Sequence, residues 1–132
     1  MNKLLFPLMI MLLLSSCKKK KEITITDNLT KIEIKEREFD FGNAYLGDTV
    51  IHVFKIKNIT NTYLKIKKTA TSCGCTTLGI IDSLAEKGET IEFKLQYIPK
   101  DDNKGKVSNS LVVEMNTEPS FAVFRLKGNV VN

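Results

Sequence analysis

The sequence predicts an all-β domain, a single antiparallel β-sandwich of about seven strands over residues 31–132. Two observations lead to this fold class. Apolar and polar residues alternate with a period of two from residue 30 onward, and no window sustains the 3.6-residue period of an amphipathic helix. Clusters of turn-forming residues separate the alternating runs at intervals of roughly 10–15 residues, which is typical of sandwiches. The chain is long enough for one hydrophobic core.

The first 16 residues are expected to be a signal peptide. Lys3 supplies a positive start, and residues 4–14 form an apolar run. At a rise of 1.5 Å per residue this run spans about 16 Å as a helix, roughly half of the hydrocarbon core of a bilayer. The run is therefore too short for a stable transmembrane helix and is typical of a secretory signal.

The next residues, Leu14, Ser15, Ser16 and Cys17, resemble the lipobox of bacterial lipoproteins. The resemblance implies that the thiol of Cys17 is alkylated with a diacylglycerol before cleavage, so that Cys17 is the lipidation site. Residues 17–30 are then a lipidated, lysine-rich linker. A lipidated N-terminal cysteine carries the two or more acyl chains that stable attachment requires. The alternative is an ordinary secretory signal in which Cys17 is coincidental.

The net charge of +5 is concentrated near the start of the chain. Lys3 and the four lysines at positions 18–21 supply all of the excess, and the remaining 15 basic residues balance the 15 acidic ones. A neutral domain lacks the basic footprint of a nucleic-acid-binding protein. The lysines lie beside the expected lipid anchor, where they can attract anionic headgroups. Some bacteria use an acidic patch at this position as a surface-export tag, so the basic run favours a periplasm-facing position in the bacterial cell envelope.

The expected strands each have one apolar and one polar face. The clearest covers residues 90–97, where four inward residues alternate with polar ones. Other alternating runs cover residues 32–35, 54–57, 64–66, 110–116 and 122–127. Turns are expected at residues 42–47, 58–62, 87–89, 99–105 and 116–119. The predicted core residues are Ile34, Phe54, Ile66, Phe93, Leu95, Leu111, Val113 and Phe124.

Few residues are suited to catalysis. His52 is the only histidine, and it shares the parity of Phe54 and Ile56, so a buried structural role is expected. Gly42 and Gly47 have the spacing of a phosphate loop, but Asp48 stands where that loop needs a lysine. No pair of carboxylates stands out. The chain is therefore expected not to be an enzyme.

The segment Cys73-Gly74-Cys75 is the one unusual constellation. In an exported protein the two thiols are expected to form an intramolecular disulfide, which the intervening glycine permits. The alternatives are redox exchange and a soft dithiolate site for Cu(I) or Zn(II). Because the chain reverses at residues 58–62, the pair is expected at the same end of the sandwich as His52. This histidine is then a candidate third metal ligand.

Several short motifs together resemble a bacterial family called domain of unknown function 1573, frequent in envelope lipoproteins. Ser-Cys-Gly-Cys-Thr at residues 72–76 is the most specific of them. The others are Phe39-Asp40-Phe41-Gly42, Gly47, His52-Val53-Phe54, Asn58, Gly88, Asn116-Thr117 and Leu126-Lys127-Gly128-Asn129-Val130. The resemblance implies an immunoglobulin-like sandwich and no established activity.

Two tripeptides resemble an O-glycosylation pattern used by such bacteria. They are Asp48-Thr49-Val50 and Asp82-Ser83-Leu84, so Thr49 and Ser83 are the candidate modification sites.

Two hypotheses about function follow. The favoured one is a non-enzymatic envelope module, held to the membrane by its N-terminal lipid, that contacts another envelope protein through a sandwich edge or its end loops. The alternative is a thiol-redox or copper-handling lipoprotein that uses Cys73 and Cys75.

Overall fold

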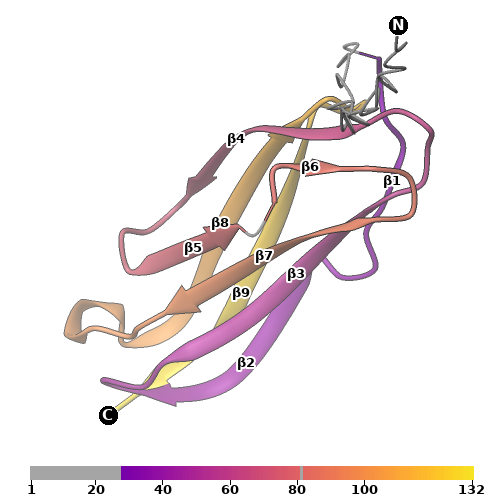
Figure 1. Ribbon diagram of the computed structural model, residues 1–132. Helices are drawn as coiled ribbons and strands as arrows, with labels where there is room; N and C mark the ends of the chain where they lie inside the picture. Colours follow the sequence, from indigo (N-terminus) through magenta and orange to yellow (C-terminus); the bar gives the residue numbers. More distant parts are fainter. Residues whose placement is uncertain (1–27, 81) are drawn as a thin grey trace, which may run out of the picture.

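The computed structural model describes residues 28–80 and 82–132, which form two β-sheets packed face to face (Figure 1). The expected signal peptide, Cys17 and the lysine run lie outside these residues. One sheet has the strand order β1-β3-β7-β5 and the other β2-β9-β8-β4-β6. The elements are β1 (Ile32–Glu33), β2 (Glu38–Tyr45), β3 (Val50–Asn58), β4 (Leu64–Thr71), β5 (Thr76–Ile80), β6 (Leu84–Ala85), β7 (Thr90–Tyr97), η1 (Asp101–Asn103), β8 (Gly105–Met115) and β9 (Phe121–Val131). Within the described ranges, no helix has the length and apolar character needed to cross a membrane.

The predicted fold class is confirmed. Seven of the described strands have five or more residues, and β1 and β6 add short edge strands of 2 residues each. The inward rows of the two sheets meet in one core, where Phe124 packs against Phe54 and Phe93 with ring centroids 5.0 and 6.0 Å apart. All of the predicted core residues belong to this core. Six are buried, and Ile34 and Ile66 are half-buried against them.

One pair of strands corrects the expectation of an entirely antiparallel sandwich. β2 and β9 run parallel, from Glu38 opposite Arg125 to Tyr45 opposite Val131. Alternation of apolar and polar residues reports which face of a strand is buried and carries no information about the direction of its neighbour. A hairpin would fix that direction, but β2 and β9 are separated by the rest of the domain.

The parallel pair arises because the start of the chain changes sheets. β1 pairs with β3, and after residues 34–37 the chain continues as β2 beside β9 in the opposite sheet. Gly42 was expected to begin a connection, but it lies inside β2. Its φ of 70° coincides with a register shift between Asp40 and Asn43, so the glycine forms a β-bulge. Alternation alone does not reveal such a bulge.

Gly128 on β9 is required by close packing against β2. A Cβ atom at this position would overlap the ring of Phe41. Phe41 in turn lies 5.8 Å, between ring centroids, from Tyr97 in the core. Because Gly128 has no side chain, the ring of Phe41 fits at this edge of the sandwich and covers the core.

We predict that Gly128→Ala lowers the free energy of unfolding by about 1–3 kcal/mol, because the new methyl group overpacks this site. The measurement is urea denaturation followed by circular dichroism. Gly79→Ala is the matched control, since its Cβ would meet Lys94 only at 3.9 Å. Adding Phe41→Ala to Gly128→Ala should cost less than it does alone. Equal stability of the Gly128→Ala and Gly79→Ala variants would contradict this account.

Candidate functional site

The edge of the four-stranded sheet at β3 is partly open. β7 pairs with β3 from Val50 to Lys57, but β1 pairs only with Lys57 and Asn58 on the other side. Within the described residues, positions 50–56 of β3 therefore have a strand neighbour on one side only. This opening is a direct result of the early change of sheets, because the chain leaves β3 after two paired residues.

The hydrogen bonds at the end of β3 show which backbone groups face the opening. Asn58 N–H donates to the carbonyl of Glu89 on the β7 side (2.9 Å), whereas Ile59 N–H donates to the carbonyl of Lys31 on the β1 side (3.1 Å). Backbone groups of consecutive strand residues point in opposite directions. The N–H and C=O groups of Val53 and Lys55 therefore point away from β7, toward the open edge.

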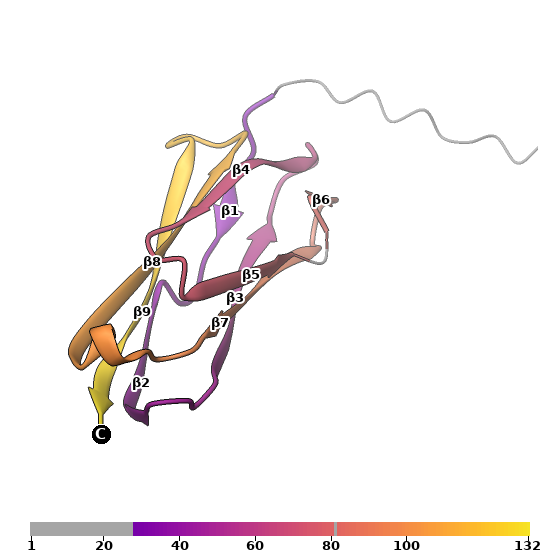
Figure 2. The same cartoon turned by 90° about the vertical axis from the view of Figure 1, so that its left-hand side faces the viewer.

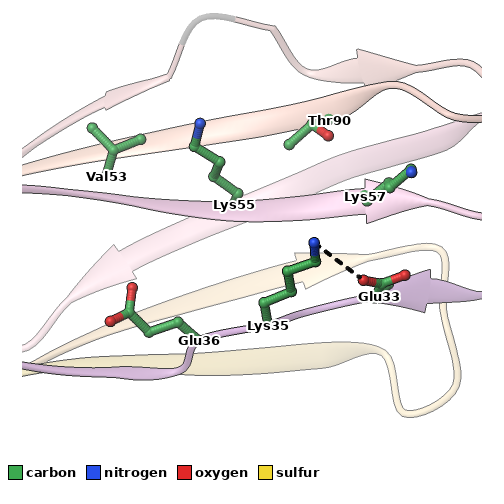
Figure 3. A pocket seen from close by; sticks show the side chains of 7 residues that line it. All are labelled: Glu33, Lys35, Glu36, Val53, Lys55, Lys57 and Thr90. Atoms are coloured by element: carbon green, nitrogen blue, oxygen red, sulfur yellow. Dashed lines mark ion pairs between the residues drawn. The ribbon is translucent and has the colours of Figure 1, made fainter.

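A groove of about 360 Å³ lies along this edge (Figure 3). Figure 3 shows side chains of β3 on one wall and of residues 33–36 on the other. Lys35 pairs with Glu33 at 4.0 Å, and Lys55 pairs with Glu92 of β7 at 2.8 Å. Among the described residues Lys57 has no ion-pair partner. The residues that line the groove are Glu33, Lys35, Glu36, Val53, Lys55, Lys57 and Thr90.

His52 connects β3 to residues 34–37, where the chain crosses between the two sheets, and to the start of β2. Its ring stacks on Phe39 with centroids 3.8 Å apart and meets the edge of Phe54 at 4.7 Å. Its Nε2 lies 2.8 Å from Oε2 of Glu36. The side chain is 18% exposed and faces the core side, as its parity predicts. The histidine thus joins residues 36 and 39 to β3 beside the groove.

Cys73 and Cys75 form a disulfide in the connection between β4 and β5, with their Cα atoms 5.2 Å apart. Thr76 N–H donates to the carbonyl of Cys73 (3.1 Å), and Ile98 N–H donates to that of Cys75 (3.3 Å). Both cysteines are half-buried, and Cys75 packs against the core.

The structure does not bring His52 to the cysteines. Val50 and Thr76 both lie opposite Tyr97, so the cysteines reach the expected end of the sandwich. However, β7 separates β3 from the strand that follows Cys75. The described residues contain no group of three or more His, Cys, Asp or Glu side chains that could hold a metal ion. A metal at the reduced cysteines would therefore have two sulfur ligands and no imidazole from His52.

Three buried polar atoms near the disulfide were not anticipated from the sequence. Thr76 Oγ1, Tyr97 OH and Asn109 Nδ2 have no hydrogen-bond partner. Burial raises the pKa of the Tyr97 hydroxyl, and the negative charge of Asp102 raises it further. Asn109 lies two residues before Leu111 and belongs to the same inward row as Leu111 and Val113. The alternation pattern, extended by one step toward the start of β8, would have predicted that Asn109 is buried. This end of the core therefore contains buried polar groups without a hydrogen-bond partner.

The two candidate glycosylation residues are exposed. Thr49 lies in the turn between β2 and β3, and Ser83 precedes β6. The carbonyl of Ser83 accepts a hydrogen bond from Ile66 N–H (2.9 Å), which fixes the backbone there. Both hydroxyl groups are on residues that an enzyme could reach.

The two sheets and the switched first strand define an immunoglobulin-like sandwich, and similar folds occur among solved structures. A protein of unknown function from Porphyromonas gingivalis W83 aligns with a TM-score of 0.69 and 14% identity over 84% of this chain and 51% of that one. This chain thus spans about half of that protein. An ASH/PapD-like domain of human CEP192 aligns with a TM-score of 0.65 and 18% identity, over 85% of this chain and 92% of that domain. The VesB protease of Vibrio cholerae aligns with a TM-score of 0.62 and 13% identity, over 81% of this chain and 33% of the protease.

These likenesses show the fold alone. The chain belongs to the protein family of unknown function DUF1573, whose model matches residues 32–130. No curated protein matches the chain.

We predict that the disulfide contributes modestly to stability. Closing a three-residue loop removes little chain entropy, so reduction should lower the free energy of unfolding by about 1.5 kcal/mol. The measurement is urea denaturation with and without reductant, combined with thiol titration and intact mass. The double variant Cys73→Ser/Cys75→Ser should match the reduced protein and be insensitive to reductant. Two freely reacting thiols in the unreduced protein would contradict the prediction.

Proposed function

We propose that the chain is a lipid-anchored, non-enzymatic protein of the bacterial cell envelope that faces the periplasm. In this proposal it binds an extended segment of another envelope protein at the open edge of β3. The observation that carries the proposal is the unpaired stretch of β3 beside the groove, where the N–H and C=O groups of Val53 and Lys55 face outward. An extended peptide can add to such an edge as a new strand, with main-chain hydrogen bonds supplying affinity.

The groove supports this proposal because it gives an added strand both space and contacts. Val53 offers a half-buried apolar contact, and Lys57, which has no ion-pair partner within the described ranges, offers an ammonium group to an acidic side chain. Of the other charged groups, Glu33, Lys35 and Lys55 have ion-pair partners within the domain, and Glu36 lies within hydrogen-bond distance of His52. The edge is also short and carries lysines, which protects the free protein against indiscriminate pairing.

Two features support a role without catalysis. His52 is stacked on Phe39 and lies within hydrogen-bond distance of Glu36, so its ring serves to hold the crossing segment. The described cysteines lie on the other side of β7 and are joined to each other, so neither is placed to act as a nucleophile beside His52.

The edge can be tested by photocrosslinking in intact cells. A benzophenone amino acid at position 55 should give a discrete protein adduct, whereas the same probe at position 112, exposed on the middle strand β8, should not. Val53→Pro removes an N–H that faces the edge and leaves the β7 ladder intact, because that N–H does not point toward β7. We expect Val53→Pro to lower the adduct at position 55 at least about fivefold, the effect of one hydrogen bond of about 1 kcal/mol.

Val53→Thr is the matched control, since it keeps both the N–H and the branched side chain. It should retain the adduct. Equal adducts at positions 55 and 112, or an adduct that survives Val53→Pro, would refute binding at this edge. Unchanged circular dichroism of both variants shows that the domain still folds.

The anchor is tested separately by Cys17→Ala. We expect this variant to move from the membrane fraction to the soluble periplasmic fraction, or to persist as an unprocessed precursor. The four lysines alone should not hold the mature protein at physiological salt, where the Debye length is about 8 Å. Fractionation followed by immunoblotting and intact mass measures the outcome. A mature Cys17→Ala protein that stayed entirely with membranes would exclude lipidation as the anchor.

The disulfide between two half-buried cysteines supports a second candidate function, thiol exchange or copper handling at Cys73 and Cys75. Its test uses the protein isolated from cells with thiols trapped at once by alkylation. A substantial reduced fraction in wild type would favour this function over the edge-binding one. Copper that unalkylated wild-type protein retains and Cys75→Ser loses would favour it equally.

A further inference from the structure

The end of the sandwich where the chain enters carries an apolar groove of about 570 Å³. Figures 1 and 2 show that the described chain begins at this end, whereas the C-terminus lies at the opposite end. Three large apolar side chains at the groove are strongly exposed: Leu29 (64%), Ile59 (46%) and Phe121 (56%). Leu29 lies in the entry segment, residues 28–31 before β1, Ile59 lies in the β3–β4 connection, and Phe121 begins β9. Three separate segments therefore place apolar groups at one end.

The entry segment is fixed firmly to this end. Thr30 N–H donates to the carbonyl of Asn116 (2.8 Å), and Thr30 Oγ1 donates to the carbonyl of Tyr63 (3.0 Å). The buried amide of Asn116 donates from Nδ2 to Thr30 Oγ1 (3.1 Å) and to the Asn28 carbonyl (3.2 Å). The exposed side chain of Leu29 is therefore held beside the groove, between two residues that are hydrogen-bonded to the sandwich.

The length of the entering chain limits how far this end can move from the membrane. The eleven residue steps from Cys17 to Asn28 span at most about 38 Å when fully extended. The four lysines at positions 18–21 lie next to Cys17, where they can draw this linker onto an anionic surface. Of the charged residues that line the groove, Lys31 and Arg37 are basic and Glu118 is acidic. Basic groups flanking exposed apolar side chains are typical of surfaces that lie in a membrane interface.

We propose that this end of the domain docks on the anionic lipid bilayer to which the protein is anchored, with Leu29, Ile59 and Phe121 entering the interface. The proposal rests on the lipid anchor at Cys17, which keeps the surface at a high effective concentration near the groove. The open edge of β3 and the disulfide then have a defined height and direction relative to the membrane. The docked surface is small, so docking depends on the anchor.

The experiment uses tryptophan fluorescence, because the chain contains no tryptophan. Phe121→Trp places a reporter in the groove, and Tyr45→Trp places one at the far end of β2, where the native side chain has the same exposure of 56%. The full lipidated chain is reconstituted into phosphatidylglycerol–phosphatidylethanolamine vesicles with and without brominated acyl chains. Flotation of the vesicles reports anchoring, and quenching by bromine reports docking.

We expect the emission of Trp at position 121 to shift to the blue and to fall about twofold or more with brominated lipid, because interfacial apolar groups lie about 5–10 Å into the boundary of headgroups and acyl chains. Emission from position 45 should not change. In the Phe121→Trp chain, Ile59→Glu should abolish the quenching without affecting flotation. The matched change Ile51→Glu, at a position with 49% exposure near the other end of β3, should leave it intact.

Equal quenching at positions 121 and 45 in floated vesicles would overturn docking while the anchor stands. A blue shift at position 121 that requires only a higher protein concentration and no lipid would also overturn it, because the groove would then be an interface between copies of the chain. Failure to float would overturn the anchor and the docking together.

Discussion

The crossing of the chain between the two sheets at residues 34–37 determines much of the remaining structure. Because β1 ends after Glu33, β3 keeps only one neighbour along most of its length. Because β2 then enters the opposite sheet, it meets β9 in the parallel orientation. His52 holds the crossing in place through Phe39 and Glu36. One short segment thus produces both the parallel pair and the open edge.

The two ends of the sandwich are built with different chemistry. At the entry end, two buried asparagines satisfy the backbone of several connections. Asn58 donates to the carbonyls of Thr62 and Ala85, and Asn116 Oδ1 accepts from Lys65 N–H. At the other end, a disulfide closes the β4–β5 connection near buried polar atoms that lack partners. Buried asparagine side chains therefore connect the backbone segments at the entry end, whereas a covalent bond closes the connection at the other end.

Much of the fold could be predicted from the sequence because burial in a sandwich imposes a period of two. The strand of residues 90–97 and its four inward side chains follow directly from that rule. The rule does not reveal which strands pair or in which register. The parallel pair and the bulge at Gly42 were therefore not predicted. It also treats Asn58 and Asn116 as turn residues, whereas their side chains are buried and act as hydrogen-bonding centres.

The candidate site was predictable only in part, for a related reason. Local spacing identified the Cys73–Cys75 pair, and a reversal of the chain placed it at the correct end of the sandwich. Whether His52 joins it depends on which strand lies between them, and that is a property of the sheet order. The open edge of β3 is likewise a property of pairing: Val53 and Lys55 look like any other strand residues until the extent of β1 is known.

The parallel pairing of β2 with β9 has a mechanical consequence. β1 starts and β9 ends at opposite ends of the sandwich (Figure 1). A force that pulls these two points apart acts along β2 and β9, whose hydrogen bonds lie across the direction of pull. Such a force stretches the bonds of the ladder together, as shear, instead of opening them one after another from an end. Tension between these two points therefore loads the whole β2–β9 ladder at once.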